Sequence, residues 1–244
     1  MGMQAGKTQK PWWILVGGRR RLGRALAERL APDHNLVLTG STSWQEETVW
    51  IKELERGTQV RCLTWDAASP DLMPTMMADL AALDTAGIHP SCAVLVSGIF
   101  PASPFGTWDR EHLEAVWQVN LTFPLLAAQA LAPHLADGGC LQFLLDVAIF
   151  KPFVQHLPYS AAKTGLAALV PGLARTLAPR LRVVGHALGT VLAAEGEDLD
   201  RVAARSLLGT VGTPEDLARA LRYAADSPYL TGEILTLDGG TRWT

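Results

Sequence analysis

Tyr159 and Lys163 are the residues of this 244-residue chain whose types and spacing most directly indicate chemistry. They lie four positions apart in Tyr159-Ser160-Ala161-Ala162-Lys163, so a helix places both side chains on one face. An ammonium group beside a phenol lowers the pKa of that phenol. We therefore expect Tyr159 to donate or accept a proton near neutral pH, with Lys163 tuning it.

A glycine- and arginine-rich segment near the N-terminus has the composition of an anion site. Its sequence is Gly17-Gly18-Arg19-Arg20-Arg21-Leu22-Gly23, and it follows the apolar run 12–16. Glycine lets the backbone approach a pyrophosphate closely, and the start of the following helix offers free N–H groups. Arginine adds bidentate pairing with phosphate. The alternative is a solvated basic patch, but the position after a first strand favours a phosphate-binding turn.

The end of the second expected strand indicates which dinucleotide the chain binds. Thr39-Gly40-Ser41-Thr42 contains no Asp or Glu, the residue types that accept hydrogen bonds from the ribose 2′-hydroxyl of NAD. Small hydroxyl residues beside arginines suit a 2′-phosphate instead. We therefore predict NADPH as the cofactor, with its 2′-phosphate near Arg20 and Ser41.

Short apolar runs alternate with helical patterns along the chain, and these elements must position the residues above. The expected strands are 12–16, 36–38, 60–63, 93–96, 140–145, 182–184 and 234–237. The expected helices are 22–30, 44–56, 112–135, 160–177 and 214–226. Continuously apolar strands indicate a parallel sheet with helices on both faces. We predict an α/β fold, a single-domain Rossmann-type doubly wound parallel sheet over residues 11–244, behind a flexible N-terminal tail of residues 1–10.

The composition argues against several classes of function. With 21 Lys and Arg against 24 Asp and Glu, the formal charge is −3, which gives no general attraction to nucleic acid or an anionic membrane. We expect no apolar run of membrane-spanning length and no signal peptide. The chain has three cysteines, Cys62, Cys92 and Cys140, which is an odd number. Neither the cysteines nor the six histidines have the spacing of metal ligands. We therefore expect a cytoplasmic protein with reduced thiols, no metal, and no membrane or nucleic-acid partner.

Taken in order, these segments resemble the short-chain dehydrogenase/reductase family over nearly the whole chain. The matching segments are 17–23, Asp66-Ala67, Asn120, Tyr159 with Lys163, Gly189-Thr190-Val191, and the tail from 229 to 240. The resemblance implies Asp66 at the adenine, Lys163 on the nicotinamide ribose and the cofactor carboxamide near Val191. It also implies Asn120 in a proton-relay position and assembly as a homotetramer, with a dimer as the alternative.

Two departures from the family pattern narrow the expected substrate. Arg21 stands where most members have the second glycine of the turn, and Asp146 where most have the serine that polarises a ketone. In both positions the chain resembles the pteridine reductases and dihydromonapterin reductases, which carry an arginine in the turn and an Asp in place of the serine. A carboxylate only accepts hydrogen bonds and would repel a developing alkoxide, so Asp146 suits a substrate with N–H groups. The alternative for Asp146 is a strand-end residue that binds backbone or Lys163.

Phe100 is a candidate for stacking on such a substrate. Pteridine reductases carry a stacking phenylalanine a residue or two further on, and a flat heteroaromatic ring gains from a parallel ring. The alternatives are an ordinary core phenylalanine or a stacking role for Phe105. Arg21 could reach both the cofactor phosphates and the substrate. His156 could line the pocket, but we interpret it as a surface-loop residue.

Other departures leave room for a divergent substrate or lost activity. Ser97-Gly98-Ile99-Phe100 replaces the family's Asn-Asn-Ala-Gly, and residues 184–189 lack the family's Asn and Pro. Pro171 lies inside the helix after Tyr159 and is expected to kink it or end it early. An acidic run in the presumed substrate loop is either solvated or discourages anionic substrates; it comprises Glu195, Glu197, Asp198 and Asp200.

Our leading hypothesis is an NADPH-dependent reductase of a pterin or dihydropterin, in which hydride reaches a C=N bond and Tyr159 supplies the proton. One alternative is a carbonyl or 3-oxoacyl reductase, and another is a non-catalytic regulator that binds NADPH or a pterin. The predicted catalytic residues are Asn120, Asp146, Tyr159 and Lys163. The predicted substrate-binding residues are Arg21, Phe100, Asp146 and Tyr159. The predicted cofactor-binding residues are Gly17, Arg19, Arg20, Arg21, Leu22, Gly23, Ser41, Thr42, Asp66, Ala67, Ser97, Gly98, Tyr159, Lys163, Gly189 and Val191.

Overall fold

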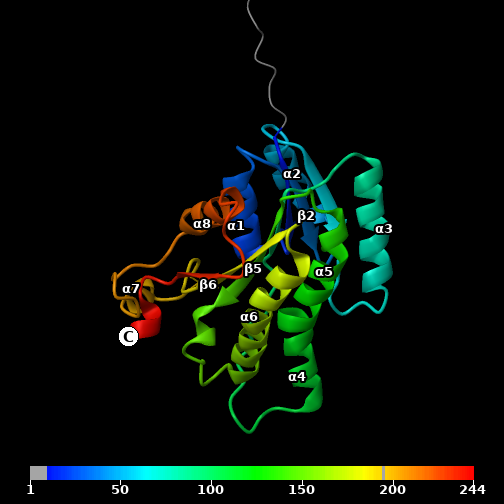
Figure 1. Cartoon of the computed structure of the whole chain (residues 1–244). Coiled ribbons are helices and arrows are strands. Elements are labelled where there is room, and N and C mark those ends of the chain that lie inside the picture. Colours follow the sequence, from blue (N-terminus) through cyan, green and yellow to red (C-terminus); the bar gives the residue numbers. More distant parts are fainter. Residues whose placement is uncertain (1–9, 194–195) are drawn as a thin grey trace, which may run out of the picture.

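A seven-stranded parallel sheet organises the chain in the computed structural model, which describes residues 10–193 and 196–244 (Figure 1). The strands are β1 (Trp12–Val16), β2 (Asn35–Gly40), β3 (Val60–Thr64), β4 (Cys92–Leu95), β5 (Cys140–Asp146), β6 (Arg182–Leu188) and β7 (Ile234–Leu237). They lie in the order β3-β2-β1-β4-β5-β6-β7. The order reverses between β1 and β4, so the sheet is doubly wound, as predicted, and a crevice forms beyond the carboxyl ends of these strands.

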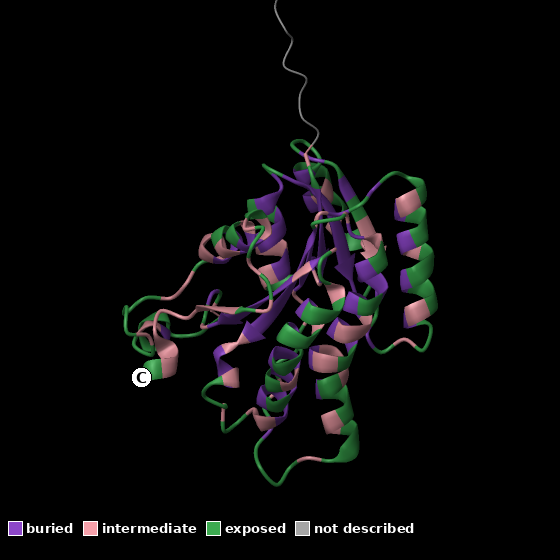
Figure 2. Cartoon of the chain, viewed as in Figure 1, coloured by how far each residue is buried: buried purple, intermediate pink, exposed green. Residues whose placement is uncertain are grey.

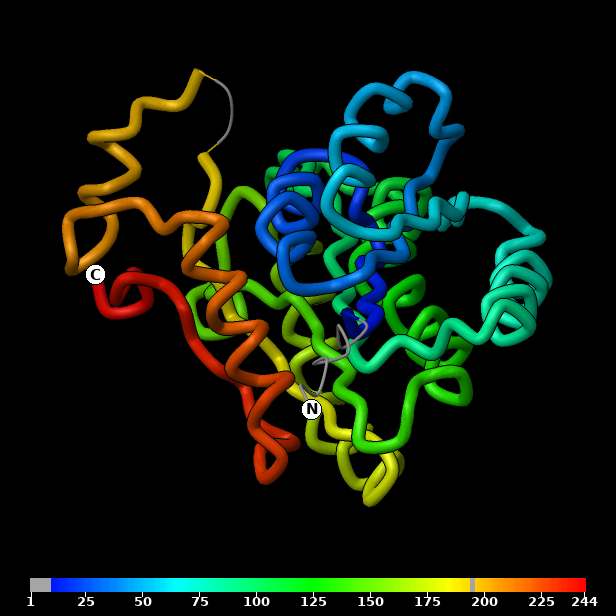
Figure 3. Tube along the Cα trace, turned by 90° about the horizontal axis from the view of Figure 1, so that it is seen from above, coloured from blue at the N-terminus to red at the C-terminus, as the bar shows by residue number. Residues whose placement is uncertain are grey.

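Helices cover both faces of this sheet. They are α1 (Arg21–Leu30), α2 (Thr48–Leu54), α3 (Leu72–Thr85), α4 (Arg110–Trp117), α5 (Phe123–Leu131), α6 (Leu157–Leu177), α7 (Leu199–Ala203) and α8 (Pro214–Asp226). Buried residues of α3, α5 and α6 form one apolar cluster with the sheet, and those of α1, α2 and α8 form a second. Figures 1 and 3 accordingly show α3 and α8 at opposite sides of the molecule.

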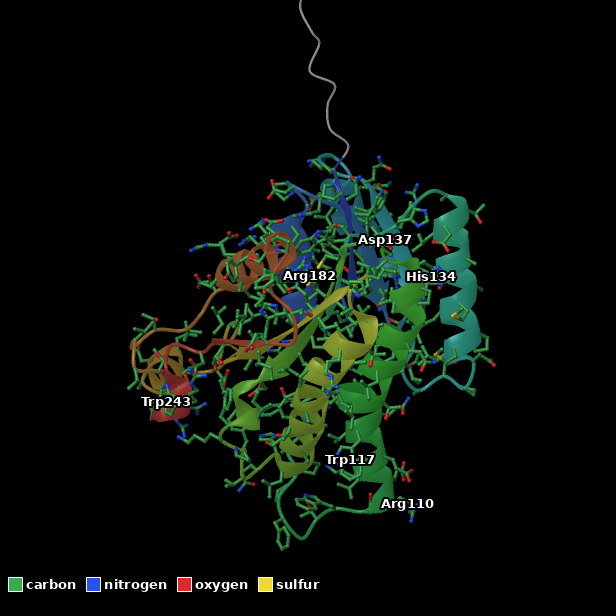
Figure 4. The ribbon with its side chains drawn as sticks, viewed as in Figure 1. Arg110, Trp117, His134, Asp137, Arg182 and Trp243 are labelled. Atoms are coloured by element: carbon green, nitrogen blue, oxygen red, sulfur yellow. The ribbon has the colours of Figure 1, made fainter. Side chains whose placement is uncertain are left out.

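The apolar runs of the sequence become the most deeply buried strands. Every residue of β1, β2 and β4 is buried, whereas the edge strands β3 and β7 are partly exposed (Figure 2). Arg182, at the start of β6, donates hydrogen bonds to the carbonyl oxygens of Ala224 (2.6 Å) and Ser227 (2.9 Å) (Figure 4). This guanidinium satisfies carbonyls at the end of α8, where a positive charge also complements the helix dipole.

The helices differ from the sequence-based expectation in several places. Helix α3 was not expected, and the expected helix 44–56 is a short 3-10 turn, η1 (Gln45–Glu47), followed by α2. The expected helix 112–135 consists of α4, a π-helical segment η2 (Gln118–Thr122), α5 and the 3-10 turn η3 (Ala132–His134). The expectation that Pro171 ends its helix early is wrong, because α6 continues to Leu177. Core packing by residues such as Val170 and Ala174 offsets the lost backbone hydrogen bond.

The segment Arg110–His134 differs from the expectation that the chain has no apolar run of membrane-spanning length. It is long and apolar enough, by length and composition, to cross a membrane, although we expected no such run. Half of its apolar window is buried inside the protein. Its buried residues Phe123, Ala127 and Leu131 belong to the core cluster that includes α3 and α6, which is the behaviour of a core helix.

Lys10 marks the beginning of the described fold. Its ammonium donates hydrogen bonds to the carbonyl oxygens of Ala31 (3.1 Å) and Gly57 (2.6 Å). Lys10 is therefore held against the folded domain, although we had placed it in a flexible tail. Residues 1–9 of that tail lie outside the described residues.

Gly23, in the first turn of α1, provides a test of the close packing at the β1–α1 turn. A Cβ atom at this position would lie 2.0 Å from the carbonyl oxygen of Gly17. We expect Gly23→Ala to lower the free energy of unfolding by about 1–3 kcal/mol, the usual cost of overpacking. Chemical denaturation followed by circular dichroism measures this change.

Gly172→Ala is the matched control, because nothing lies within 4 Å of its Cβ position in α6. Alanine is favoured over glycine inside a helix, so this variant should keep or raise the stability. Equal losses in the two variants would contradict the packing argument.

Candidate active site

A cavity of about 1410 Å³ runs along the carboxyl ends of the strands and brings most of the predicted site residues together. The predicted residues that line it are Gly17, Arg19, Arg20, Arg21, Leu22, Gly23, Ser41, Asp66, Ala67, Ser97, Gly98, Phe100, Asp146, Tyr159, Lys163, Gly189 and Val191. Among the described residues, Thr42 and Asn120 were predicted for the site but do not line the cavity. Most of the residues that line the cavity therefore come from segments that follow the carboxyl ends of the strands.

The turn after β1 combines a close backbone approach with a strained arginine. A Cβ atom at Gly17 would lie 2.9 Å from the backbone nitrogen of Ser97, so only glycine fits there. Arg21 has a φ of 47°, and within residues 10–193 and 196–244 it is the one non-glycine residue with positive φ. A side chain rarely adopts this left-handed conformation, and such strain concentrates at binding sites. Arg21 thus occupies a glycine-like backbone position at the edge of the cavity.

Arg19 lies over the end of β2 rather than pointing into solvent. It is 5% exposed, and a Cβ atom on Gly40 would lie 2.9 Å from its Cδ atom. Its guanidinium forms ion pairs with Glu46 (Nη2 to Oε2, 3.4 Å) and Glu47 (Nε to Oε1, 3.7 Å). These glutamates lie beyond the segment 39–42, and no role in the site was predicted for them. Arg20 and Arg21 are exposed at the cavity.

Tyr159, Lys163 and Asp146 meet where β5 ends and α6 begins. The Tyr159 hydroxyl donates to Asp146 Oδ2 at 2.9 Å, and Asp146 Oδ1 accepts from the backbone N–H of Ala148 at 2.8 Å. The Lys163 ammonium donates to the carbonyl oxygen of Leu144 at 2.9 Å and lies 5.7 Å from the centre of the Tyr159 ring. Asp146 therefore binds the backbone at the end of β5, as the strand-end alternative expects, and it also contacts Tyr159. Its binding to a substrate stays a prediction.

The expectation that the pKa of Tyr159 is lowered is wrong. Burial raises the pKa of Tyr159 well above its usual value, and the charge and hydrogen bond of Asp146 raise it further. Burial lowers the pKa of Lys163 to about 8, although Asp146 opposes this change. Burial also raises the pKa of Asp146, against the hydrogen bonds from Ala148 and Tyr159. Tyr159 is therefore a neutral phenol here, which suits a proton donor and not a base.

The start of α6 is fixed by a neighbouring helix. Trp117, at the end of α4, donates from its indole nitrogen to the carbonyl oxygen of Pro158 at 3.1 Å (Figure 4). Pro158 is in the first turn of α6, where its missing N–H has no helical partner to lose. Because Tyr159 follows directly, this contact positions its ring against β5.

Asn120 lies beneath the cavity in the π-helical segment η2. Its Oδ1 atom accepts from the backbone N–H of Ile99 (3.2 Å), and its Nδ2 atom donates to the carbonyl oxygens of Ile99 (2.9 Å) and Val116 (2.9 Å). Asn120 thus holds the backbone next to Phe100. Its role in a proton relay stays a prediction.

Phe100 and His156 form an aromatic pair in the cavity. Phe100 is 53% exposed, so it is not a core residue, and its ring centre lies 3.7 Å from that of His156 at an interplanar angle of 15°. Its edge-to-face contact with Tyr159 is 4.7 Å between ring centres. Phe105 is 83% exposed and packs on Trp108 instead. The interpretation of His156 as a surface-loop residue is wrong, because His156 lines the cavity. Its position three residues before Tyr159 could have indicated this from the sequence.

Several residues that line the cavity were not predicted from the sequence. They include Trp65 after β3, Arg205 after α7, and Thr241 in the last 3-10 turn, η5 (Thr241–Trp243). Within the acidic run, Glu197 lines the cavity, while Asp198 caps the start of α7 by accepting from the backbone N–H of Asp200 and Arg201. Glu195 lies outside the described residues.

The cavity has the features that a dinucleotide needs. The glycine turn allows the close backbone approach that a pyrophosphate needs, and arginine side chains also line the cavity. The Ser97 hydroxyl is buried at the cavity and has no hydrogen-bond partner within the described part of the chain. A buried polar group without a partner marks a position that a ligand can satisfy. A doubly wound sheet with this edge defines the class of dinucleotide-binding Rossmann-type proteins.

The comparison with known sequences assigns the family. A family model described as "Enoyl-(Acyl carrier protein) reductase" matches residues 17–242. The chain belongs to the short-chain dehydrogenase/reductase family of oxidoreductases.

Individual relatives agree with this assignment. The "Short-chain dehydrogenase/reductase SDRA" of Arabidopsis thaliana is 34% identical, over 52% of this chain and 54% of that protein, so the chain spans about half the length of this relative. The human "Dehydrogenase/reductase SDR family member 4" is 28% identical over 90% of this chain and 83% of that protein. A solved "blue fluorescent protein from metagenomic library in complex with NADPH" is 26% identical, covers 96% of this chain and 98% of its own, and has a TM-score of 0.85.

The hydrogen bond between Asp146 and Tyr159 allows a prediction about the pKa of Tyr159. Burial raises the pKa of Tyr159 and the charge of Asp146 raises it further, so removing that charge in Asp146→Asn should lower the midpoint of Tyr159 ionisation. Ultraviolet titration measures this midpoint in a background with Tyr223→Phe and Tyr229→Phe, since the chain has 3 tyrosines.

Asp137→Asn serves as the control, because Asp137 is exposed and precedes β5 at the opposite end of that strand (Figure 4). An unchanged or higher midpoint in Asp146→Asn would show that Asp146 does not set the state of Tyr159.

Proposed function

We propose that the protein is an NADPH-dependent reductase of a planar nitrogen heterocycle of the pterin or dihydropterin class. The observation that carries this proposal is the carboxylate of Asp146, which accepts the Tyr159 hydrogen bond at the site where ketone-reducing relatives need a donor. Substrates with ring N–H or amino groups match such an acceptor. A developing alkoxide does not, because a carboxylate repels it.

The reaction we propose adds a hydride and a proton across a C=N bond. NADPH supplies the hydride when it is bound. Tyr159 is a neutral phenol and donates its proton to the ring nitrogen. The ammonium of Lys163 lies beside the Tyr159 ring and stabilises the phenolate that remains. Asp146 accepts a hydrogen bond from the substrate and so orients the ring nitrogen toward Tyr159.

The choice of NADPH rests on the end of β2. Arg19 lies over Gly40, next to the exposed Ser41, and this edge of the cavity also carries Arg20. A 2′-phosphate there would replace Glu46 and Glu47 as the partner of Arg19, forming charge-assisted hydrogen bonds. The similar blue fluorescent protein, solved in complex with NADPH, supports this proposal by analogy.

A second candidate function is reduction of a carbonyl or 3-oxoacyl group. One observation favours it: Asp146 accepts a hydrogen bond from the backbone N–H of Ala148 at the end of β5. If this hydrogen bond is the whole role of Asp146, the carboxylate is incidental to the reaction.

Oxidation of NADPH in the presence of dihydrobiopterin, dihydromonapterin or a simple ketone separates the two candidates. We expect turnover of a dihydropterin, and a loss of at least about tenfold in kcat/KM for Asp146→Ser, since a positioned proton-transfer network is disrupted. Turnover of the ketone alone, with activity kept or gained in Asp146→Ser, would refute the pterin proposal. Asp137→Ser is the control for loss of an unrelated carboxylate.

Replacing Arg19 tests the cofactor choice separately. Arg19→Gln removes the cation next to the proposed 2′-phosphate, so the preference for NADPH over NADH should fall by about tenfold or more. Equilibrium fluorescence titration with each cofactor measures the two dissociation constants. Arg29→Gln, at the far end of α1, should keep the wild-type ratio. Equal affinity of the unmodified protein for both cofactors would contradict the proposal.

A further inference from the structure

The backbone on both sides of Phe100 is held by side chains from other elements. On one side, Asn120 of η2 binds both the N–H and the carbonyl oxygen of Ile99, at 3.2 and 2.9 Å. On the other side, His156 Nδ1 lies 2.7 Å from the carbonyl oxygen of Pro101. The hydroxyl of the buried Ser103 lies 3.1 Å from the same carbonyl oxygen. Phe100 therefore sits on a segment that is fixed at its two neighbours.

His156 is the one of these residues that also touches the Phe100 ring. Because Nδ1 faces a carbonyl oxygen, this nitrogen carries the proton and donates it. The imidazole ring is nearly parallel to the Phe100 ring, with an angle of 15° and 3.7 Å between centres. One face of Phe100 is thus covered by His156, and Tyr159 meets the ring edge-on at 80°.

The position of His156 is itself tied to the catalytic group. His156 directly precedes α6, whose third residue is Tyr159, and its backbone carbonyl accepts from Ser160 N–H at 3.0 Å. Phe153 also meets the Phe100 ring edge-on, at 5.9 Å between ring centres. Phe100 is 53% exposed at the cavity, so solvent reaches the part of the ring that these three aromatic neighbours leave uncovered. An aromatic side chain that is ordered before binding loses less conformational entropy when a ligand stacks on it.

We propose that His156 is a positioning residue for the substrate, acting through Phe100. Its ring stack and its hydrogen bond to Pro101 hold the Phe100 ring ready to stack on a flat heteroaromatic ligand above Tyr159. The identity of that ligand rests on the proposed function, whereas the aromatic contacts that hold Phe100 do not depend on it.

Binding of 2,4-diaminopteridine in the presence of saturating NADP⁺ tests this inference. The probe is a flat pteridine that the protein need not reduce, and its fluorescence reports the dissociation constant. We expect His156→Ala and Phe100→Ala each to weaken binding by about fivefold to tenfold, the range of a single aromatic contact. The affinity for NADPH and the circular dichroism spectrum should stay unchanged. His89→Ala, an exposed histidine paired with Asp84, is the control.

Two conservative variants separate the contributions of His156. His156→Phe keeps an aromatic ring on Phe100 but loses the donor to Pro101, and His156→Gln keeps a donor but loses the ring. Each should show a smaller loss than His156→Ala. Should both bind the probe as weakly as the alanine variant, the proposed mode of positioning is wrong.

The double variant His156→Ala/Phe100→Ala is decisive. Because His156 acts through Phe100, the double variant should bind no more weakly than Phe100→Ala alone. Losses that multiply would mean that His156 does not act through Phe100, and wild-type affinity in His156→Ala would overturn the inference outright. If the wild type fails to bind the probe, Phe100 is not a stacking surface and the inference also fails. If it binds the probe but reduces no dihydropterin, the proposed function fails and this inference stands.

Discussion

The hydrogen bond between Tyr159 and Asp146 is the contact on which the proposed chemistry depends. It joins the end of β5 to the first turn of α6, in a position where both groups are removed from water. A buried phenol without an acceptor, or a buried carboxylate without donors, would be costly. Here the phenol has Asp146, and the carboxylate also has the N–H of Ala148. Burial and this contact together keep Tyr159 protonated, and burial lowers the pKa of Lys163 to about 8 against the charge of Asp146.

The sheet and most of the cavity could be predicted from the sequence, because both follow from simple periodic constraints. Strands buried on both faces must be continuously apolar, and the carboxyl ends of parallel strands meet at one edge. Helix α3 was missed because its apolar residues do not lie on one face only: Met77 is exposed, while Met76 and Leu80 are buried. The effect of Pro171 was misjudged because the packing of α6 on β5 and β6 outweighs one lost hydrogen bond.

The features that the sequence could not predict depend on tertiary distances. The spacing of Tyr159 and Lys163 indicated a lowered phenol pKa, but burial and the charge of Asp146 act in the opposite direction. Arg19 was treated as one of three equivalent cations, yet it alone is buried, because Gly40 leaves room for its side chain. Arg205 reaches the cavity from a segment whose sequence contains no recognisable motif. The position of the site at the carboxyl ends of the strands could thus be predicted, whereas some of its side chains are brought there only by the fold.

A crystal structure of the protein with NADP⁺ and a pteridine bound would show whether Asp146 binds the substrate. We expect the pteridine ring to lie parallel to Phe100, with a ring N–H or amino group donating to Asp146 at about 2.7–2.9 Å, the usual length of a charge-assisted bond. We also expect a ring nitrogen within hydrogen-bond distance of the Tyr159 hydroxyl. A pteridine bound elsewhere, or one that makes no contact with the Asp146 carboxylate, would show that Asp146 does not orient the substrate.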